Sequence, residues 1–156
     1  MCLKGMTLHP PYRLHHSLGY HLSVASRLQE RRLDEQLKTL GLTRTSWCIL
    51  LAVGVENLTQ PSDIADFVGI DRTATSRALR RMESAGLLCR ASGQADKRTR
   101  QVSLTEAGRE AINSAAPHAR ANAAIMTARL ASGEAQELLR LLAKLRRDDD
   151  PRLNTL

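Results

Sequence analysis

The sequence predicts a mainly α-helical protein that carries one small β-hairpin near the middle of the chain. Apolar residues recur every three or four positions in most segments, which is the spacing of an amphipathic helix. The exception is a pair of short runs, 87–90 and 99–104, that a polar, turn-rich loop separates; this pattern is typical of a β-hairpin. With 156 residues, 42% of them hydrophobic, the chain has enough apolar side chains for one domain with helical extensions.

The first expected helix covers residues 12–40. Its apolar residues follow helical spacing at Leu14, Leu18, Leu22, Ala25, Leu28, Leu33 and Leu37. Gly41 is placed to end this helix, because glycine readily adopts the left-handed conformation that is common just after a helix. Thr43 is then a suitable N-cap for a second, mostly apolar helix over residues 44–53. Residues 1–11 are expected to be a flexible lead-in.

Two further helices with a tight turn between them are expected next. Pro61 favours the start of the third helix, where its missing N–H leaves no bond unmade. The turn at 69–70 leads to Asp71, which can cap a fourth helix over 72–85 that Gly86 ends. Two helices joined by a short turn that contains glycine are typical of a helix-turn-helix. The hairpin that follows predicts its winged form.

Two long helices are expected after the hairpin. Thr105 can cap the fifth helix, which runs toward Leu130 and which Pro117 should kink or split. Ser132 can cap the sixth helix, and its leucines share one side at Leu138, Leu139, Leu142 and Leu145. These apolar faces are longer than one small domain can cover, so the terminal helices are expected to mediate dimerisation.

The expected organisation therefore has a centre and two helical ends. Residues 41–104 form the winged helix-turn-helix region. Residues 12–40 and 105–147 form the helical dimerisation region, and 148–156 are expected to be a flexible tail. The chain is thus predicted to be a homodimer.

The positive charge is concentrated in one part of the chain. The whole sequence has a net charge of +7, and residues 71–109 hold nine Lys/Arg against four Asp/Glu, a net +5. The segments 1–70 and 110–156 each carry only +1. A basic patch between nearly neutral flanks favours a polyanionic partner, although a solvated basic face without a partner would have the same composition.

Double-stranded DNA is the polyanion that this order of elements favours. An α-helix fits the major groove, where its first turns meet base edges and phosphates. Small residues allow close approach, arginines reach guanines or phosphates, and the hairpin reaches the flanking backbone or minor groove. The candidate DNA contacts are Arg72, Thr73, Ala74, Ser76, Arg77 and Arg80 on the fourth helix and Lys97, Arg98 and Arg100 on the hairpin.

Three stretches resemble the MarR (multiple antibiotic resistance regulator) family of winged helix-turn-helix transcription regulators. The most specific is 96–108, which has the family's Asp-x-Arg, an alternating strand and Leu-Thr-x-x-Gly. Residues 70–77 and 82–87 are similar to the recognition helix and its exit. Leu42-Thr43, with Trp47 and Leu50, resembles the second helix. The likeness extends from about Leu14 to Arg146.

The resemblance implies roles for individual residues. Arg98 would be the wing-tip arginine that enters the minor groove, and Asp96 the wing acid that orients nearby arginines. The first, fifth and sixth helices would form the dimer interface. A dimer would meet two half-sites about 34 Å apart on a pseudo-palindromic operator.

The resemblance also implies control by a small molecule. A ligand, often aromatic or anionic, would bind between the dimerisation helices and the DNA-binding region and release a repressor from its operator. Ligand and DNA would then weaken each other's binding by the same coupling free energy. His16, Tyr20 and Trp47 are candidate pocket residues, because each joins an apolar body to a polar tip.

Other functions have less support. No nucleophile elbow, phosphate-binding glycine loop or HExxH motif occurs, so neither an enzyme nor a cofactor is expected. His15, His16 and His21 lack the i, i+4 spacing of a helical metal site, so no metal is expected. A protein-interaction module, or a metal- or redox-responsive member of the same family, are the alternatives. Scattered cysteines (Cys2, Cys48, Cys89) and the lack of a membrane-spanning run or signal peptide predict a cytoplasmic protein.

Overall fold

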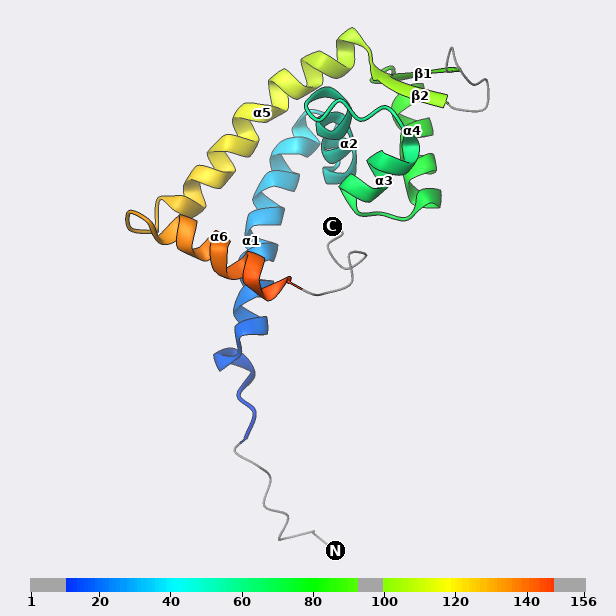
Figure 1. Cartoon of the computed structure of the whole chain (residues 1–156). Helices are drawn as coiled ribbons and strands as arrows, with labels where there is room; N and C mark the ends of the chain where they lie inside the picture. The colour runs from blue at the N-terminus through cyan, green and yellow to red at the C-terminus, as the bar shows by residue number, and fades with distance from the viewer. Residues whose placement is uncertain (1–10, 93–99, 148–156) are drawn as a thin grey trace, which may run out of the picture.

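A computed structural model describes residues 11–92 and 100–147 and shows helices with one two-stranded sheet at the edge of the molecule (Figure 1). The elements, in order, are a 3₁₀ turn at Leu14–His16, α1 Leu18–Thr39, α2 Arg44–Gly54, α3 Pro61–Val68, α4 Arg72–Ser84, β1 Leu88–Ser92, β2 Arg100–Leu104, α5 Glu106–Thr127 and α6 Glu134–Leu145. The mainly α fold with a small hairpin is therefore confirmed.

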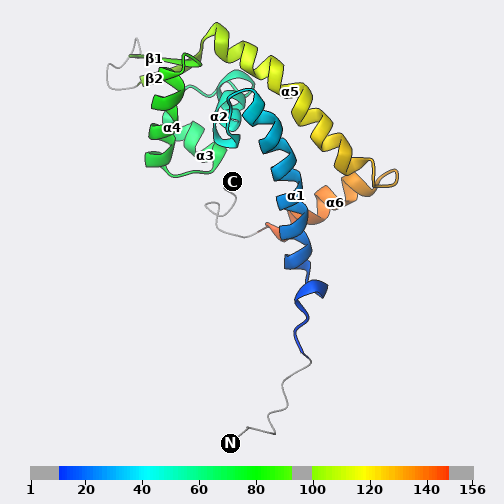
Figure 2. The same ribbon diagram turned by 180° about the vertical axis from the view of Figure 1, so that it is seen from behind.

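The molecule has a central lobe, made of α2, α3, α4 and the β1–β2 hairpin, from which two long helices extend. α1 and α5 run side by side away from the lobe, and α6 turns back beyond the far end of α5 (Figures 1 and 2). The core lies inside the lobe and under the adjoining ends of the long helices. Its fully buried side chains include Leu37, Ile49, Leu50, Ile64, Leu79, Leu88 and Val102.

The hairpin is antiparallel, with Leu88 opposite Leu104 and Ser92 opposite Arg100. Leu88 and Val102 point into the core, whereas Cys89 is exposed, as the alternation of side chains along a strand requires. The Val102 N–H donates to the Thr59 carbonyl at 2.8 Å, which fixes β2 to the connection between α2 and α3. Strand β2 is thus bonded on both of its edges, to β1 and to Thr59.

The predicted N-caps of the lobe are confirmed. The Thr43 hydroxyl accepts from the Ser46 N–H, and the Asp71 carboxylate accepts from the Ala74 N–H at 2.8 Å. Gly41, Gly69 and Gly86 all have positive φ at helix ends, where glycine avoids the strain that a side chain would bring.

Three expected boundaries were wrong. α1 begins at Leu18 and not at residue 12, because the Ser17 hydroxyl caps it by accepting from the Tyr20 N–H. α5 ends at Thr127, before Leu130. Ser132 does not cap α6: Gly133, at φ 86°, is the N-cap, and the Glu134 carboxylate accepts from the Ala131 N–H at 2.7 Å instead.

Pro117 does not split α5, which is one helix from Glu106 to Thr127. Proline removes only one intrahelical hydrogen bond, and the helix around it is held by packing. Ala115 is fully buried, and Ala116 and Ala119 pack against the core. Burial on one side therefore keeps the helix continuous through the proline.

Across the described ranges, 11–92 and 100–147, no helix is both long and apolar enough to cross a membrane.

Candidate nucleic-acid interface

The turn between α3 and α4 is built by local hydrogen bonds. Gly69 takes a left-handed conformation (φ 76°), and its N–H donates to the Ala65 carbonyl at 2.8 Å. Two residues later Asp71 caps α4 with its carboxylate, and its own carbonyl accepts from the Thr75 hydroxyl at 2.9 Å. These bonds fix the direction in which α4 leaves the turn.

One face of α4 is buried and its other faces are exposed. Thr75, Ala78, Leu79 and Met82 are each at most 5% exposed and hold the helix on the lobe. Arg72, Thr73, Arg77 and Arg80 are exposed, and Ala74 and Ser76 are half-buried. The six candidate contacts on this helix therefore all lie outside its buried face.

The exposed arginines of α4 surround a shallow, open hollow. Ala74, Arg77, Arg80 and Arg81 line it. Arg80 donates to the Ser76 hydroxyl at 3.2 Å, and no carboxylate of the described residues pairs with any of the three arginines. Their positive charges are therefore available to an anionic partner.

Arg81 is a candidate that the sequence interpretation left out of this set. It is exposed and lies four residues after Arg77, so the two side chains are neighbours on the helix surface. The i, i+4 spacing of Arg77 and Arg81 in the sequence would have identified Arg81 as a candidate DNA contact.

The hairpin is tied to α4 by an ion pair. The guanidinium of Arg90, on β1, donates to the Glu83 carboxylate of α4 through Nε at 2.8 Å and through Nη2. Asp96, Lys97 and Arg98 lie outside the described residues. Arg100 opens β2 opposite Ser92. The described part of the hairpin is thus held against α4.

The Leu-Thr-x-x-Gly motif joins the hairpin to α5. The Thr105 hydroxyl donates to the Gly86 carbonyl at 2.5 Å and accepts from the Gly108 N–H at 3.1 Å. Gly108 packs against the backbone after α4: a Cβ added there would lie 2.2 Å from the Leu87 carbonyl oxygen. Glycine is required at this position because the two backbones approach so closely.

The three candidate effector-pocket residues are not brought together within one chain. His16 is exposed and Tyr20 half-buried near the start of α1. Trp47 is buried in the core with Leu33 and Leu37, near the other end of α1. The 13 residues from Tyr20 to Leu33 span about 20 Å of helix. Tyr20 instead packs on His15, with ring centroids 4.6 Å apart.

The far end of the molecule carries an open apolar groove between α1, α5 and α6. It has a volume of about 500 Å³, and its lining includes Leu28, Met126, Leu130, Leu138, Leu139 and Leu142, with Arg32 and Arg129. No residue of α6 is buried, and Leu139 is 67% exposed. Within one chain this apolar surface stays uncovered.

The remaining candidates concern metals and thiols. Within the described residues, no group of three or more His, Cys, Asp or Glu side chains is placed to hold a metal ion. Burial raises the pKa of the Cys48 thiol, an effect that Arg44 only partly opposes. Because the thiolate is the reactive form, this environment does not favour Cys48 as a redox sensor.

Comparison with known proteins agrees with this arrangement. Residues 40–99 match the model of the MarR family. A regulator of Bordetella bronchiseptica, BpsR, superposes with a TM-score of 0.80 at 22% identity, covering 89% of this chain and 99% of the other. A probable transcriptional regulator of Pseudomonas aeruginosa gives 0.76 at 26%, covering 85% and 99%.

A third solved structure contains DNA. A cysteine-to-serine mutant of E. coli MarR in complex with operator DNA gives a TM-score of 0.75 at 25% identity, covering 82% of this chain and 92% of the other. The family match spans the helix-turn-helix with its exposed arginines, and the fold matches over the remaining helices. Residues 40–99 are therefore similar to the MarR family of winged helix-turn-helix transcription regulators, and the chain as a whole shares the fold of solved regulators, one of them bound to operator DNA.

Proposed function

We propose that this protein is a cytoplasmic homodimeric repressor that binds a pseudo-palindromic DNA operator and releases it when a small molecule binds. The observation that carries the proposal is the exposed arginine face of α4. Arg77, Arg80 and Arg81 surround an open hollow, and none of them pairs with a carboxylate of the described residues. Such a face is suited to the phosphates and guanine edges of a major groove.

The hairpin extends this contact. Arg90 and Glu83 hold β1 against α4, so the hairpin leaves the lobe beside the arginine face. In this proposal Lys97, Arg98 and Arg100 reach the flanking backbone, with Arg98 in the minor groove and Asp96 orienting the arginines. A guanidinium suits a narrow groove, where the negative potential is strongest.

The uncovered groove supports dimerisation by a second copy of this chain. Five large apolar residues of α6 and its surroundings (Leu138, Leu139, Leu141, Leu145 and Ile125) are each more than 40% exposed. An apolar surface of this extent marks an interaction site in a soluble protein. A twofold axis would place the α6 leucines of each copy against α1 and α5 of the other, and it would present two α4 helices to successive turns of DNA.

The effector is proposed by analogy with a relative. DNA binding by the Bordetella regulator is regulated by 6-hydroxynicotinic acid, a small aromatic acid. His16, Tyr20 and Trp47 remain the proposed contacts here. Because they are separated within one chain, a common pocket requires that the partner's α1 approach the central lobe.

A binding titration tests the proposal. Wild-type protein would select duplexes from a random-sequence pool, and the affinity for the winning duplex would be measured by fluorescence anisotropy at about 50 and 200 mM salt. A DNA-binding protein loses affinity steeply with salt, because cations are released from the phosphates. Failure to enrich any duplex, or an affinity that salt does not change, would favour the protein-interaction module.

A further inference from the structure

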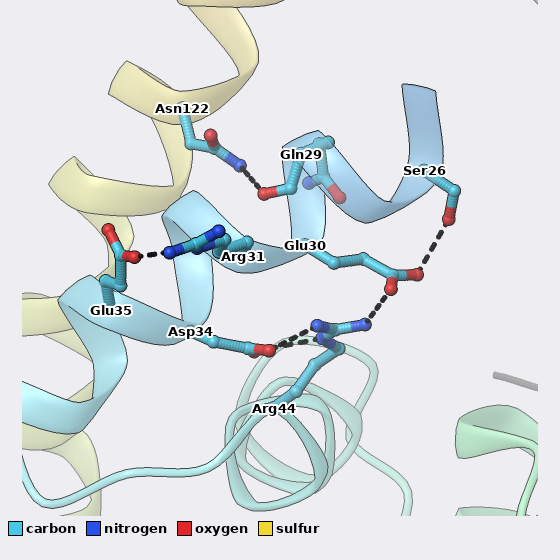
Figure 3. Close-up of polar contacts among 8 residues, drawn as sticks. All are labelled: Ser26, Gln29, Glu30, Arg31, Asp34, Glu35, Arg44 and Asn122. Carbon is cyan, nitrogen blue, oxygen red and sulfur yellow. Dashed lines mark hydrogen bonds and ion pairs between the residues drawn. The ribbon is translucent and has the colours of Figure 1, made fainter. Parts of the chain in front are cut away.

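A three-residue ion-pair network connects α1 to the first residue of α2 (Figure 3). The Arg44 guanidinium donates to both oxygens of Asp34, through Nε at 3.1 Å and Nη2 at 2.5 Å, and its Nη1 lies 3.0 Å from Glu30 Oε2. The Ser26 hydroxyl donates to the other Glu30 oxygen at 2.8 Å. All three guanidinium nitrogens are therefore engaged with one face of α1.

This network differs from an ordinary surface pair on the same helix. Arg31 and Glu35 lie one turn apart on α1, and their side chains are 82% and 63% exposed. Arg44 is 28% exposed and joins two helices. An exposed pair one turn apart fixes nothing outside its own helix, whereas a two-pronged Arg–carboxylate contact between helices fixes their relative orientation.

The contact between Arg44 and Glu30 is charged at neutral pH. Hydrogen bonds from Ser26 and Arg44 hold the pKa of Glu30 below its usual range. Burial acts to lower the pKa of Arg44, but its bonds to Asp34 and Glu30 outweigh this effect and raise it. The contact is thus charged under the conditions in which DNA binding is measured.

The network lies where α1 leaves the central lobe. Leu33 and Leu37 of α1 are buried in the core, whereas Ala25, Leu28 and Gln29 line the uncovered groove. Glu30 lies between these two sets along α1, and Asp34 directly follows the buried Leu33. α2 packs on α4 inside the lobe, so the angle between α1 and α2 determines where α4 sits relative to the groove.

We propose that Arg44 is a positioning residue that sets the separation of the two recognition helices, and hence the half-site spacing that the dimer accepts. It acts by holding Glu30 and Asp34, so the angle between the dimerising helix α1 and the central lobe is fixed. This inference rests on the proposed DNA-binding dimer. It adds a determinant of operator spacing that lies outside the arginine face of α4.

The test uses the duplex that the wild-type protein selects, rebuilt with one base pair removed from or added to its centre. Wild type should prefer the parent spacing by about tenfold, the size of a single mismatch. Arg44→Gln should bind all three duplexes within about threefold of one another, because a free α1–α2 angle lets the lobes adjust. Lysine cannot bind both oxygens of Asp34 as arginine does, so the spacing preference of Arg44→Lys should lie between those of wild type and Arg44→Gln. The matched control, Arg31→Gln, should keep the wild-type preference.

A second measurement needs no DNA. Cys89 is exposed on β1, so a spin label there, in a Cys2→Ser, Cys48→Ala background, reports the distance between the lobes of a dimer. Wild type and Arg31→Gln should give one narrow distance distribution, and Arg44→Gln a broader one. Glu30→Gln with Asp34→Asn should reproduce the broadening if Arg44→Gln does not fold.

The two proposals fail in different ways. If the wild-type protein selects no duplex, the proposed function is wrong. If wild type binds with a preferred spacing, and a folded, dimeric Arg44→Gln keeps both that preference and the narrow distribution, the role of Arg44 is wrong.

Discussion

The central lobe and the α6 end of the molecule use their apolar residues in opposite ways. In the lobe, Ile49, Leu50, Ile64 and Val102 are fully buried within one chain. In α6 no residue is buried, although seven of its 12 residues are leucine or alanine in an amphipathic pattern. The lobe therefore buries its apolar residues within a single chain, whereas the α6 end leaves its apolar face uncovered. Substitutions in the lobe should therefore lower the unfolding free energy, whereas substitutions in α6 should weaken self-association.

The largest effect is expected inside the lobe, from Gly108→Val. A Cβ at this position would lie 2.2 Å from the Leu87 carbonyl oxygen, so α5 must move away from the exit of α4. We expect a loss of about 3 kcal/mol or more in unfolding free energy, measured by urea denaturation. Gly19→Ala is the control, because nothing lies within 4 Å of the added methyl group. Equal stabilities would contradict the close approach.

A charge on α6 should break the dimer and leave the lobe intact. Leu139 is 67% exposed in one chain but faces the groove that we assign to the partner. Leu139→Asp should weaken self-association by about a hundredfold or more, because a buried unpaired charge costs about 3–5 kcal/mol. Sedimentation equilibrium measures this effect. Gln136→Asp adds the same charge to an exposed polar position of α6 and should leave the dimer unchanged.

DNA binding should depend on the arginine face of α4 and on the wing. Arg77→Ala, and separately Arg98→Ala, should each weaken binding to the selected duplex by about 1–3 kcal/mol. Anisotropy titrations give this value, and thermal unfolding should be unchanged because Arg77 is exposed and has no ion-pair partner among the described residues. Arg31→Ala removes an equal charge far from the interface. If it weakened binding as much, net charge alone would explain the affinity.

The smallest expected effect is the pH dependence of the stability that the Arg44 contact between α1 and α2 contributes. The pKa of Glu30 is lowered in the folded protein, so its ionised form favours folding above its unfolded pKa of about 4.3. This contribution is lost as pH falls through the lower, folded-state pKa. The stability difference between wild type and Arg44→Gln should therefore be largest near pH 7 and shrink below about pH 4. A difference that is constant with pH would exclude an ionic contribution.

The sequence predicted the lobe well because its signals are local. Thr43, Asp71 and Thr105 each cap a helix within three residues of themselves, and Gly41 and Gly86 end helices by their own conformational freedom. The periodicity of α4 likewise separated Thr75 and Leu79 from the exposed arginines. The boundary at Ser132 was wrong because a left-handed glycine and a glutamate performed the capping that a serine usually performs.

The rest depended on contacts between distant residues. Arg44 meets Asp34 ten positions away on another helix, and Asn122 donates to the Gln29 carbonyl 93 positions away (Figure 3). No periodicity indicates such pairs. The proposed effector residues were chosen by residue type alone, and a single chain separates Trp47 from His16 and Tyr20. The wing residues Asp96, Lys97 and Arg98 stay predictions, since they lie outside the described residues.

The close contact at Gly108 fastens the first turn of α5 beside the hairpin, so a small tilt there becomes a large displacement at the other end of the helix. The helix has 22 residues, so it is about 33 Å long. With its first turn fastened to Gly86 and Leu87, a tilt of about 5° moves its distal end by about 3 Å. The same geometry runs in reverse: a displacement of about 3 Å at the groove end of α5 corresponds to a tilt of about 5° at its hairpin end.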